Sequence, residues 1–245
     1  MSDAPARALA ELASSALEPI YQRLGRIADE VLRARPPRSP LTEAHLSELQ
    51  HLLVEFLGEE PAVWGMGFVA APTVVDARER YLLWWQRHGE RVARLRLNFD
   101  PASVDVYDYL QMDWYQLALR GQARVAYGPY VDYSGSDMYT ITATIPVLAD
   151  GVFLGVAGAD LVVAEVEHRL LAALRQSSED AVIVSPERRV IMANTPRWIV
   201  GSRLSALPSA GPPTDPSVFR EVRQMPLGTG WVLAVAWPQE PGIDN

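Results

Sequence analysis

The sequence predicts an α+β protein with a long N-terminal helix followed by two modules built on antiparallel sheets, the second smaller than the first. Two observations lead to this prediction. Apolar residues near the N-terminus recur at helical spacing, and from Ala62 onward short runs of aromatic and β-branched residues alternate with turn signals. We expect a helical segment over residues 1–60, a larger module over 61–165 and a smaller module over 166–245. A chain of 245 residues can bury the core that this arrangement needs.

The first helix is expected over residues 8–34, because apolar side chains every three or four residues form one continuous stripe. Pro19 should kink or split it, since proline lacks the N–H that the helix ladder uses. Ser39 and Pro40 have the order of an N-cap and a first helical residue, which predicts a second helix that stops near Gly58.

The apolar stripe of the first helix has two possible packing roles. It can pack against the sheet of its own domain, and it can form a seam between two copies of the chain. We expect both, because a helix of this length usually projects past a small domain. The predicted homodimer would use residues near Leu12, Ile20 and Ile27.

The larger module is expected to begin with three neighbouring antiparallel strands, over residues 63–71, 80–87 and 92–99. Residues 104–121 then have apolar side chains at helix-like intervals. The clearest strand pair lies in residues 138–163, where Asp150 and Gly151 supply the dipeptide that a tight hairpin turn prefers.

The smaller module is expected to follow a helix over residues 163–176. Residues 180–194 are typical of a strand, a turn and a second strand, and residues 228–238 of a returning strand. Between them, residues 208–217 form a proline-rich loop with no periodicity.

Composition excludes several classes of function. A net charge of −8 argues against a nucleic-acid surface, which needs clustered basic residues, but it would attract a cationic ligand. The absence of cysteine removes thiol nucleophiles and zinc–thiolate sites, and the four scattered histidines lack metal-ligand spacing. We therefore expect no metal and no cofactor. No apolar run approaches the length of a membrane span or a signal segment, so we expect no membrane partner and a cytoplasmic protein.

Aromatic rings and carboxylates are concentrated between residues 107 and 160. Ring faces attract a cation through their quadrupole, and carboxylates accept hydrogen bonds from its N–H groups. Together they indicate a cage for an organic cation, and therefore binding chemistry. The candidate residues are Tyr107, Trp114, Tyr115, Tyr130, Asp132 and Asp160. For Asp132 a simpler role stays open, namely capping the turn over residues 133–137.

With these residues at these spacings, the sequence resembles the double Cache domains, the PAS-like ligand-sensing folds of bacterial chemoreceptors and sensor kinases. The resemblance covers nearly the whole chain and implies two PAS-like modules with the ligand in the first. Members that bind amino acids share a motif of tyrosine, arginine, Trp-Tyr, Tyr-x-Asp and aspartate. On this chain the motif falls on Tyr107, Met112, Trp114 with Tyr115, Tyr130 with Asp132, and Asp160.

The departure from the motif is at Met112, where the family has the arginine that grips a ligand carboxylate. The resemblance implies that the tyrosines and aspartates hold the ligand ammonium, so this chain keeps that half of the motif and lacks the other. Methionine offers only an apolar contact, and a buried carboxylate without a partner costs several kcal/mol. We therefore expect an amine without a carboxylate as ligand, with Asp113 as a second anionic contact for a diamine if it faces inward.

The leading functional hypothesis is a soluble, stand-alone Cache-type sensor that binds a small organic amine and signals to a separate protein partner. Three alternatives stay open: an amino-acid-binding sensor, an enzyme of amine metabolism in which Asp132 or Asp160 acts as general base, and an interaction scaffold with a vestigial cage. We expect no catalytic residue.

Overall fold

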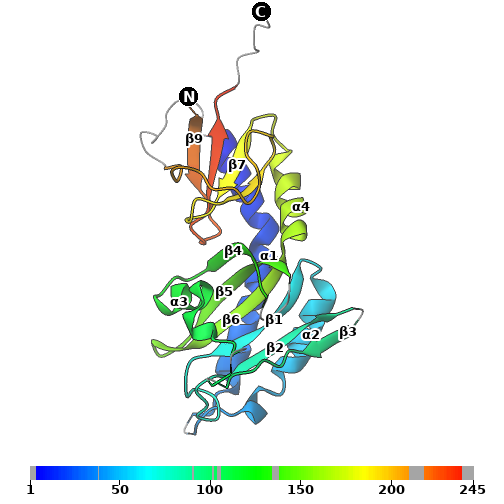
Figure 1. Ribbon diagram of the computed structural model, residues 1–245, viewed down its shortest axis with the longest axis vertical. Coiled ribbons are helices and arrows are strands. Elements are labelled where there is room, and N and C mark those ends of the chain that lie inside the picture. Colours follow the sequence, from blue (N-terminus) through cyan, green and yellow to red (C-terminus); the bar gives the residue numbers. More distant parts are fainter. Residues whose placement is uncertain are drawn as a thin grey trace, which may run out of the picture. The chain divides into compact units, whose positions relative to one another are not determined.

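The structure, a computed structural model, describes residues 4–37, 39–89, 91–100, 102–103, 106–133, 138–209 and 218–238. The chain divides into two compact units. The larger runs from Pro19 to Glu165, and the smaller combines Met1–Glu18 with Val166–Asn245. Each unit contains one antiparallel sheet, of six strands in the larger and four in the smaller (Figure 1). The predicted α+β class, with a long N-terminal helix and a smaller second module, is confirmed.

The sheet of the larger unit has the strand order β3-β2-β1-β6-β5-β4, and every neighbouring pair is antiparallel. The predicted hairpin is β5–β6, and its turn is made by Asp150 and Gly151, both at positive φ. The predicted strands are present, but the third, expected over residues 92–99, is shorter and ends at Arg94, and β4 was not anticipated. The strands are β1 (Val63–Ala70), β2 (Leu82–His88), β3 (Arg91–Arg94), β4 (Val125–Val131), β5 (Tyr139–Ala149) and β6 (Val152–Val162).

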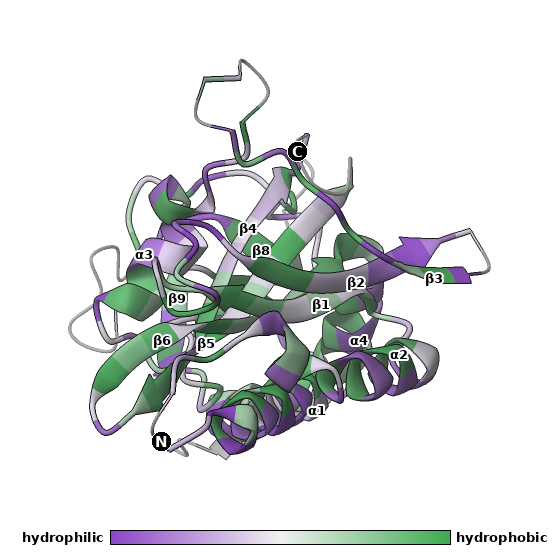
Figure 2. Ribbon diagram, turned by 90° about the horizontal axis from the view of Figure 1, so that it is seen from below, coloured by the Kyte–Doolittle hydropathy of each residue, from purple (hydrophilic) through white to green (hydrophobic). Residues whose placement is uncertain are grey.

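Two helices cover one face of this sheet, as Figure 2 shows. Helix α1 (Ala4–Ala34) passes through Pro19 without a break, so the helix is not split there. The second helix starts later than Ser39 and Pro40 predict: a 3₁₀ turn, η1 (Glu43–Leu46), precedes α2 (Leu49–Glu59). Helix α1 is fixed to the edge of the sheet, because the hydroxyl of Tyr21 donates to the carbonyl of Val125 at 2.8 Å.

The apolar stripe of α1 packs inside the chain. Ile20 and Ile27 are fully buried, so the prediction that they contribute to a dimer seam is wrong: their side chains are already used in the core. Leu12, the third residue of the predicted seam, is 42% exposed. The packing role of the stripe is therefore confirmed. Of the three residues, Leu12 is the one whose side chain is exposed and could contact a partner.

The predicted helix over residues 104–121 is shorter than expected. A 3₁₀ turn, η2 (Tyr109–Gln111), leads through Met112, whose backbone is extended, into α3 (Asp113–Leu119). Tyr107 precedes both in an irregular segment, where its N–H donates to the carbonyl of Asn98 at 2.9 Å. Residues 104 and 105 lie outside the described part of the chain.

The smaller unit has the strand order β8-β7-β10-β9 and follows α4 (Val163–Leu174). The predicted strand, turn and strand are β7 (Ala181–Val184) and β8 (Val190–Ala193), and the returning strand is β10 (Val232–Ala236). Strand β9 (Phe219–Gln224) was not anticipated. Most of the proline-rich loop, residues 210–217, lies outside the described residues.

Candidate functional site

The candidate site lies on the face of the larger sheet that α3 covers. Residues paired across antiparallel strands project to the same face. Asp160 on β6 pairs with Thr142 on β5 and with Gly65 on β1, and Gly67 on β1 pairs with Trp84 on β2. The backbone register therefore brings a carboxylate, a hydroxyl and an indole to one surface.

Glycines on this face make room for the indole of Trp84. A Cβ added at Gly65 would lie 2.5 Å from Nε1 of Trp84, and one at Gly158 would lie 3.3 Å from its Cζ3. The indole therefore lies across both positions. Larger residues there would lift it from the sheet and change the wall of the site.

Above this surface is a small cavity of about 20 Å³. It is close to the smallest volume that holds one water molecule, so its walls must separate to admit an organic ligand. The wall is mainly apolar and aromatic, with two carboxylates and one hydroxyl. It consists of Val69, Leu82, Trp84, Leu95, Leu97, Tyr107, Trp114, Asp132, Thr142 and Asp160.

A chain of hydroxyl groups reaches the buried carboxylate of Asp160. The hydroxyl of Thr142 donates to Oδ1 of Asp160 at 2.8 Å, and the hydroxyls of Tyr130 and Thr142 are 2.7 Å apart. A register shift in β4 between Tyr127 and Tyr130 accompanies this placement of Tyr130. One lone pair of Asp160 is thus satisfied by Thr142, and its second oxygen has no hydrogen-bond partner given by the described residues.

Burial controls the protonation of the site. The pKa of Asp160 is raised from 3.8 to about 7, mainly by burial; the hydrogen bond from Thr142 acts against this rise and the charge of Asp132 adds to it. Burial also raises the pKa of Tyr107 and of Tyr130, again with the two aspartates adding to the effect. Both tyrosines therefore stay protonated, and a cation in the cavity would favour the charged form of Asp160.

Four of the predicted residues line the cavity together, namely Tyr107, Trp114, Asp132 and Asp160. Tyr130 stands one hydrogen bond behind them, through Thr142. The backbone N–H of Asp132 donates to the carbonyl of Met138 at 3.0 Å. The alternative role of Asp132 as a turn cap involves residues 134–137, which lie outside the described residues.

The other three predicted residues lie elsewhere. Tyr115 is buried in an aromatic cluster, with its ring 5.5 Å from that of Tyr109 and 5.6 Å from that of Phe153. Asp113 is exposed and accepts a hydrogen bond from Tyr127, so the inward-facing second anion is not found. Met112 packs on the outside of the same apolar cluster.

Sequence reasoning missed Trp84, Thr142 and the leucines of the cavity wall. The threonine had a usable signal: Thr140, Thr142 and Thr144 alternate along β5 and are all buried, which marks an inward face with hydroxyl groups. Thr144 uses its hydroxyl to fix α3, donating to the carbonyl of Trp114 at 3.2 Å. Leu82 begins β2, and Leu95 and Leu97 follow the end of β3, so these leucines lie in or beside predicted strands but carried no signal of a binding role.

The described residues show neither a metal site nor a membrane-spanning helix. They contain no group of three or more His, Asp or Glu side chains that could hold a metal ion. None of their helices combines the length and the apolar character that crossing a membrane demands.

Comparison with sequence families gives one match. Residues 49–168 match the family described as methyl-accepting chemotaxis protein-like, first PDC sensor domain. These residues include α2, the whole six-stranded sheet and every residue of the candidate site. A search of curated proteins gives no match.

Solved structures match most of the chain at low sequence identity. The ligand-binding domain of the Campylobacter jejuni chemoreceptor Tlp3 in complex with L-valine has a TM-score of 0.59 at 14% identity, over 94% of this chain and 90% of that one. The extracellular domain of the histidine kinase mmHK1S-Z3 has a TM-score of 0.59 at 16% identity, over 96% and 92%. Methyl-accepting chemotaxis protein X has a TM-score of 0.56 at 16% identity, over 93% and 95%. These structures share the fold of this chain, and the family match covers residues 49–168.

Proposed function

We propose that the larger unit is a sensor domain whose cavity binds a small organic cation, and that occupancy is passed to a separate protein partner. The ammonium group would lie between Asp132 and Asp160, against the rings of Tyr107 and Trp114. A sensor needs a binding equilibrium and a change in the protein on binding, and it needs no chemical step.

The buried carboxyl of Asp160 carries this proposal. A charged carboxylate is rarely buried without a cationic partner, because desolvation costs more than one hydrogen bond returns. The described residues give Asp160 a hydrogen bond from Thr142 and no ion pair. An ammonium ligand would supply both the missing charge and the missing donors.

An α-amino acid is the second candidate ligand, because Tlp3, which shares the fold, has been solved with L-valine and with isoleucine. The cavity wall argues against it. None of the described residues that line the cavity is basic, and Met112 stands where the amino-acid-binding members have arginine. A ligand carboxylate would be buried there beside two aspartates.

An enzyme is the third candidate, and one observation favours it: a pKa of about 7 suits a general base. Asp160 would then take a proton from a bound amine or from water. The family match favours a sensor, since it is to a chemoreceptor sensor domain. Incubating the protein with each binding amine and quantifying the amine by mass spectrometry separates the two, because only an enzyme consumes it.

Calorimetry with a panel of small amines, L-valine and n-hexanoate tests the proposed ligand class. We expect binding of one or more amines and weak or no binding of L-valine. Asp160→Ala should lower amine affinity by thirtyfold or more, about 2–5 kcal/mol, because it leaves the cation unpaired. The matched control is Asp113→Ala, which removes an exposed carboxylate outside the cavity and should have little effect.

A second variant tests the reason for excluding amino acids. Met112 lies outside the cavity and packs against the apolar cluster that borders it. Met112→Arg should shift the preference toward ligands that carry a carboxylate if the longer arginine side chain brings its guanidinium to the cavity wall. Tight binding of L-valine by the unmodified protein, or amine affinity unchanged by Asp160→Ala, would show that the cation cage is wrongly assigned. The homodimer, the cytoplasmic location and the partner stay predictions, and light scattering of the full chain tests the first.

A further inference from the structure

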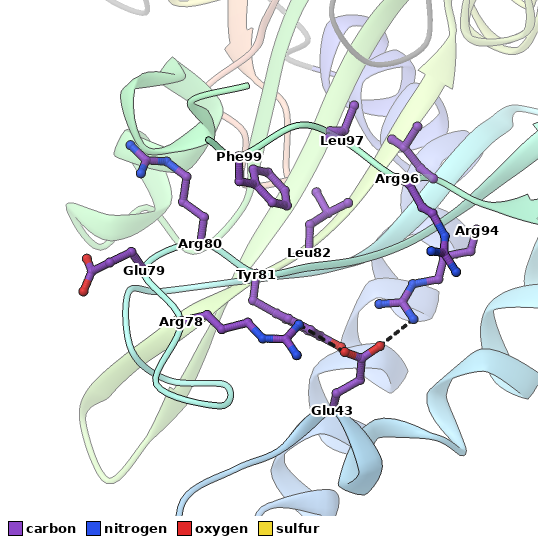
Figure 3. Close-up of a pocket in the computed structure, with 11 residues that line it drawn as sticks. Glu43, Arg78, Glu79, Arg80, Tyr81, Leu82, Arg94, Arg96, Leu97 and Phe99 are labelled. Atoms are coloured by element: carbon purple, nitrogen blue, oxygen red, sulfur yellow. Dashed lines mark hydrogen bonds and ion pairs between the residues drawn. The ribbon is translucent and has the colours of Figure 1, made fainter. Parts of the chain in front are cut away.

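The larger unit also contains a second cavity, of about 710 Å³, well inside the range of 300–1,000 Å³ usual for ligand sites. Figure 3 shows its lining residues. Four of them are arginines, in a chain whose 22 basic residues are all arginine and whose net charge is −8. We call it the arginine pocket. It is lined by Glu43, Arg78, Glu79, Arg80, Tyr81, Leu82, Arg94, Leu95, Arg96, Leu97 and Phe99.

One carboxylate in the arginine pocket already shows how an anion is held there. Glu43 lies between two guanidinium groups that come from opposite sides of the pocket (Figure 3). Its Oε2 is 3.2 Å from Nη1 of Arg78, and its Oε1 is 2.5 Å from Nη1 of Arg94. A carboxylate held by one N–H donor from each of two arginines is the arrangement of a bound organic acid.

Donors remain available after these internal pairs are made. Arg80 is paired with Asp108, and Arg78 has Asp76 as a second partner. Arg94 makes one ion pair, through a single nitrogen, and Arg96 has no ion pair or hydrogen bond within the part of the chain that the structure describes. A guanidinium has five N–H donors, so these last two have most to offer a ligand.

The backbone places these two arginines at the same pocket. Strand β3 ends at Arg94, and the N–H of Leu95 still donates to the carbonyl of Trp84 at 2.9 Å, which holds this stretch beside β2. Arg94 and Arg96 both line the pocket, as Figure 3 shows. Leu95 and Leu97 pack against the aromatic cluster of the cation cage. The pocket therefore combines a pair of arginines with an apolar wall, which Phe99 extends.

A further polar group lacks a partner. Tyr81 is 3% exposed, and its buried hydroxyl has no hydrogen-bond partner among the described residues. Burial, and next the charge of Glu43, raises its pKa to about 12, so the hydroxyl stays protonated and can donate. A buried donor without an acceptor is costly, and an acidic group bound beside Glu43 would relieve that cost.

We propose that the arginine pocket is a second ligand site, which binds a small organic anion. Its acidic group pairs with Arg94 and Arg96, and its apolar body lies on Leu97 and Phe99. Glu43 competes with the ligand for Arg94, which keeps the affinity moderate and the pocket neutralised between binding events. The site stands whether or not the neighbouring cage binds a cation.

Calorimetry on the full chain tests this site, with n-hexanoate, succinate and inorganic phosphate as probes. We expect n-hexanoate to bind best, because it has both a carboxylate and an apolar body. Arg96→Gln should weaken its binding tenfold or more. The control is Arg91→Gln, which makes the same change in strand β3 at an exposed arginine outside the pocket and should alter the affinity less than twofold. Glu43→Gln should strengthen binding, since it removes the internal competitor.

Three outcomes would overturn the proposal. The first is no binding of any probe at millimolar concentration. The second is equal loss of affinity in Arg96→Gln and Arg91→Gln, which would indicate attraction to surface charge in general. The third is n-hexanoate binding that Trp114→Ala abolishes and Arg96→Gln leaves unchanged, which would place the anion in the cation cage. If phosphate bound as tightly as n-hexanoate, the pocket would be a site for anions in general, and the proposal that it prefers an organic anion would be wrong.

Discussion

The cavity beside Asp160 and the arginine pocket share the wall of Leu82, Leu95 and Leu97 and differ in volume and in the charge that lines them. The cavity beside Asp160, the proposed cation cage, has a volume of about 20 Å³ and contains two buried aspartates. The arginine pocket has a volume of about 710 Å³, and its charges form ion pairs at partly exposed positions.

The two cavities therefore differ in how much free energy it costs to keep a charged group in place before a ligand binds. In the cage, the cost of burying Asp160 is present before any ligand arrives, so protonation controls binding. In the arginine pocket, partly solvated ion pairs keep the cost small, and such pairs are screened by salt. The cage should therefore respond to pH and the arginine pocket to ionic strength.

The largest expected effect is the pH dependence of stability, which belongs to the cage alone. Because the pKa of Asp160 is raised from 3.8 to about 7, the folded chain keeps a proton there that the unfolded chain has lost. The free energy of unfolding should therefore fall as pH rises from about 4 to about 7, by up to about 4 kcal/mol, and then level off. Asp160→Asn should remove this slope and be more stable than the unmodified protein at pH 8.

Urea unfolding between pH 5 and pH 8.5 measures the slope. Asp113→Asn is the matched control, since Asp113 is exposed, and it should leave the slope unchanged. A slope that survives Asp160→Asn would mean that another group controls it and that the buried carboxyl is not the source of the pH response.

The next effect concerns the glycine floor of the cage. Gly65→Ala places a methyl group 2.5 Å from Nε1 of Trp84, and it should cost about 1–3 kcal/mol of stability through overpacking. Gly25→Ala, in α1, is the control, because nothing lies within 4 Å of its added Cβ. That change should stabilise the chain by about 0.5–1 kcal/mol, as usual for alanine in a helix. Equal effects in chemical denaturation would show that the indole does not lie on Gly65.

The smallest effect distinguishes the two cavities directly. Trp114→Ala should lower amine affinity by about 1–2 kcal/mol, since it removes one ring face and some packing. It should leave n-hexanoate binding within twofold, because Trp114 does not line the arginine pocket. Calorimetry with both probes on one variant gives the answer, and a similar loss for both would mean that the cavities behave as one site.

The sequence located the strongly patterned elements and missed two strands at the edges of sheets. Strand β4 contains Gly128 and Pro129, residues that argue against a strand; an edge strand tolerates proline because one side of it needs no hydrogen bonds. Strand β9, Phe219–Gln224, has three charged residues among its six, and it too is an edge. Propensity describes central strands, and these two are held by a single neighbour each.

The family motif identified cavity residues on a strand, on a helix and in an irregular segment, but it did not resolve which neighbours along helix α3 face the cavity. Asp160 and Trp114 line the cavity as the motif implies, whereas Asp113 and Tyr115 do not, because helix α3 turns them toward Tyr127 and Tyr109. The arginine pocket had no signal in one stretch of sequence. Its residues lie between positions 43 and 99 and meet only because the sheet and η1 bring them together.

The position of Trp84 also allows ligand binding in the cage to be followed by tryptophan fluorescence. Its indole and that of Trp114 both line the cavity, and indole emission depends on the polarity around the ring. A ligand that separates the cavity walls would change the surroundings of both rings at once. Intrinsic tryptophan fluorescence should therefore report occupancy of the cavity without an added dye or label.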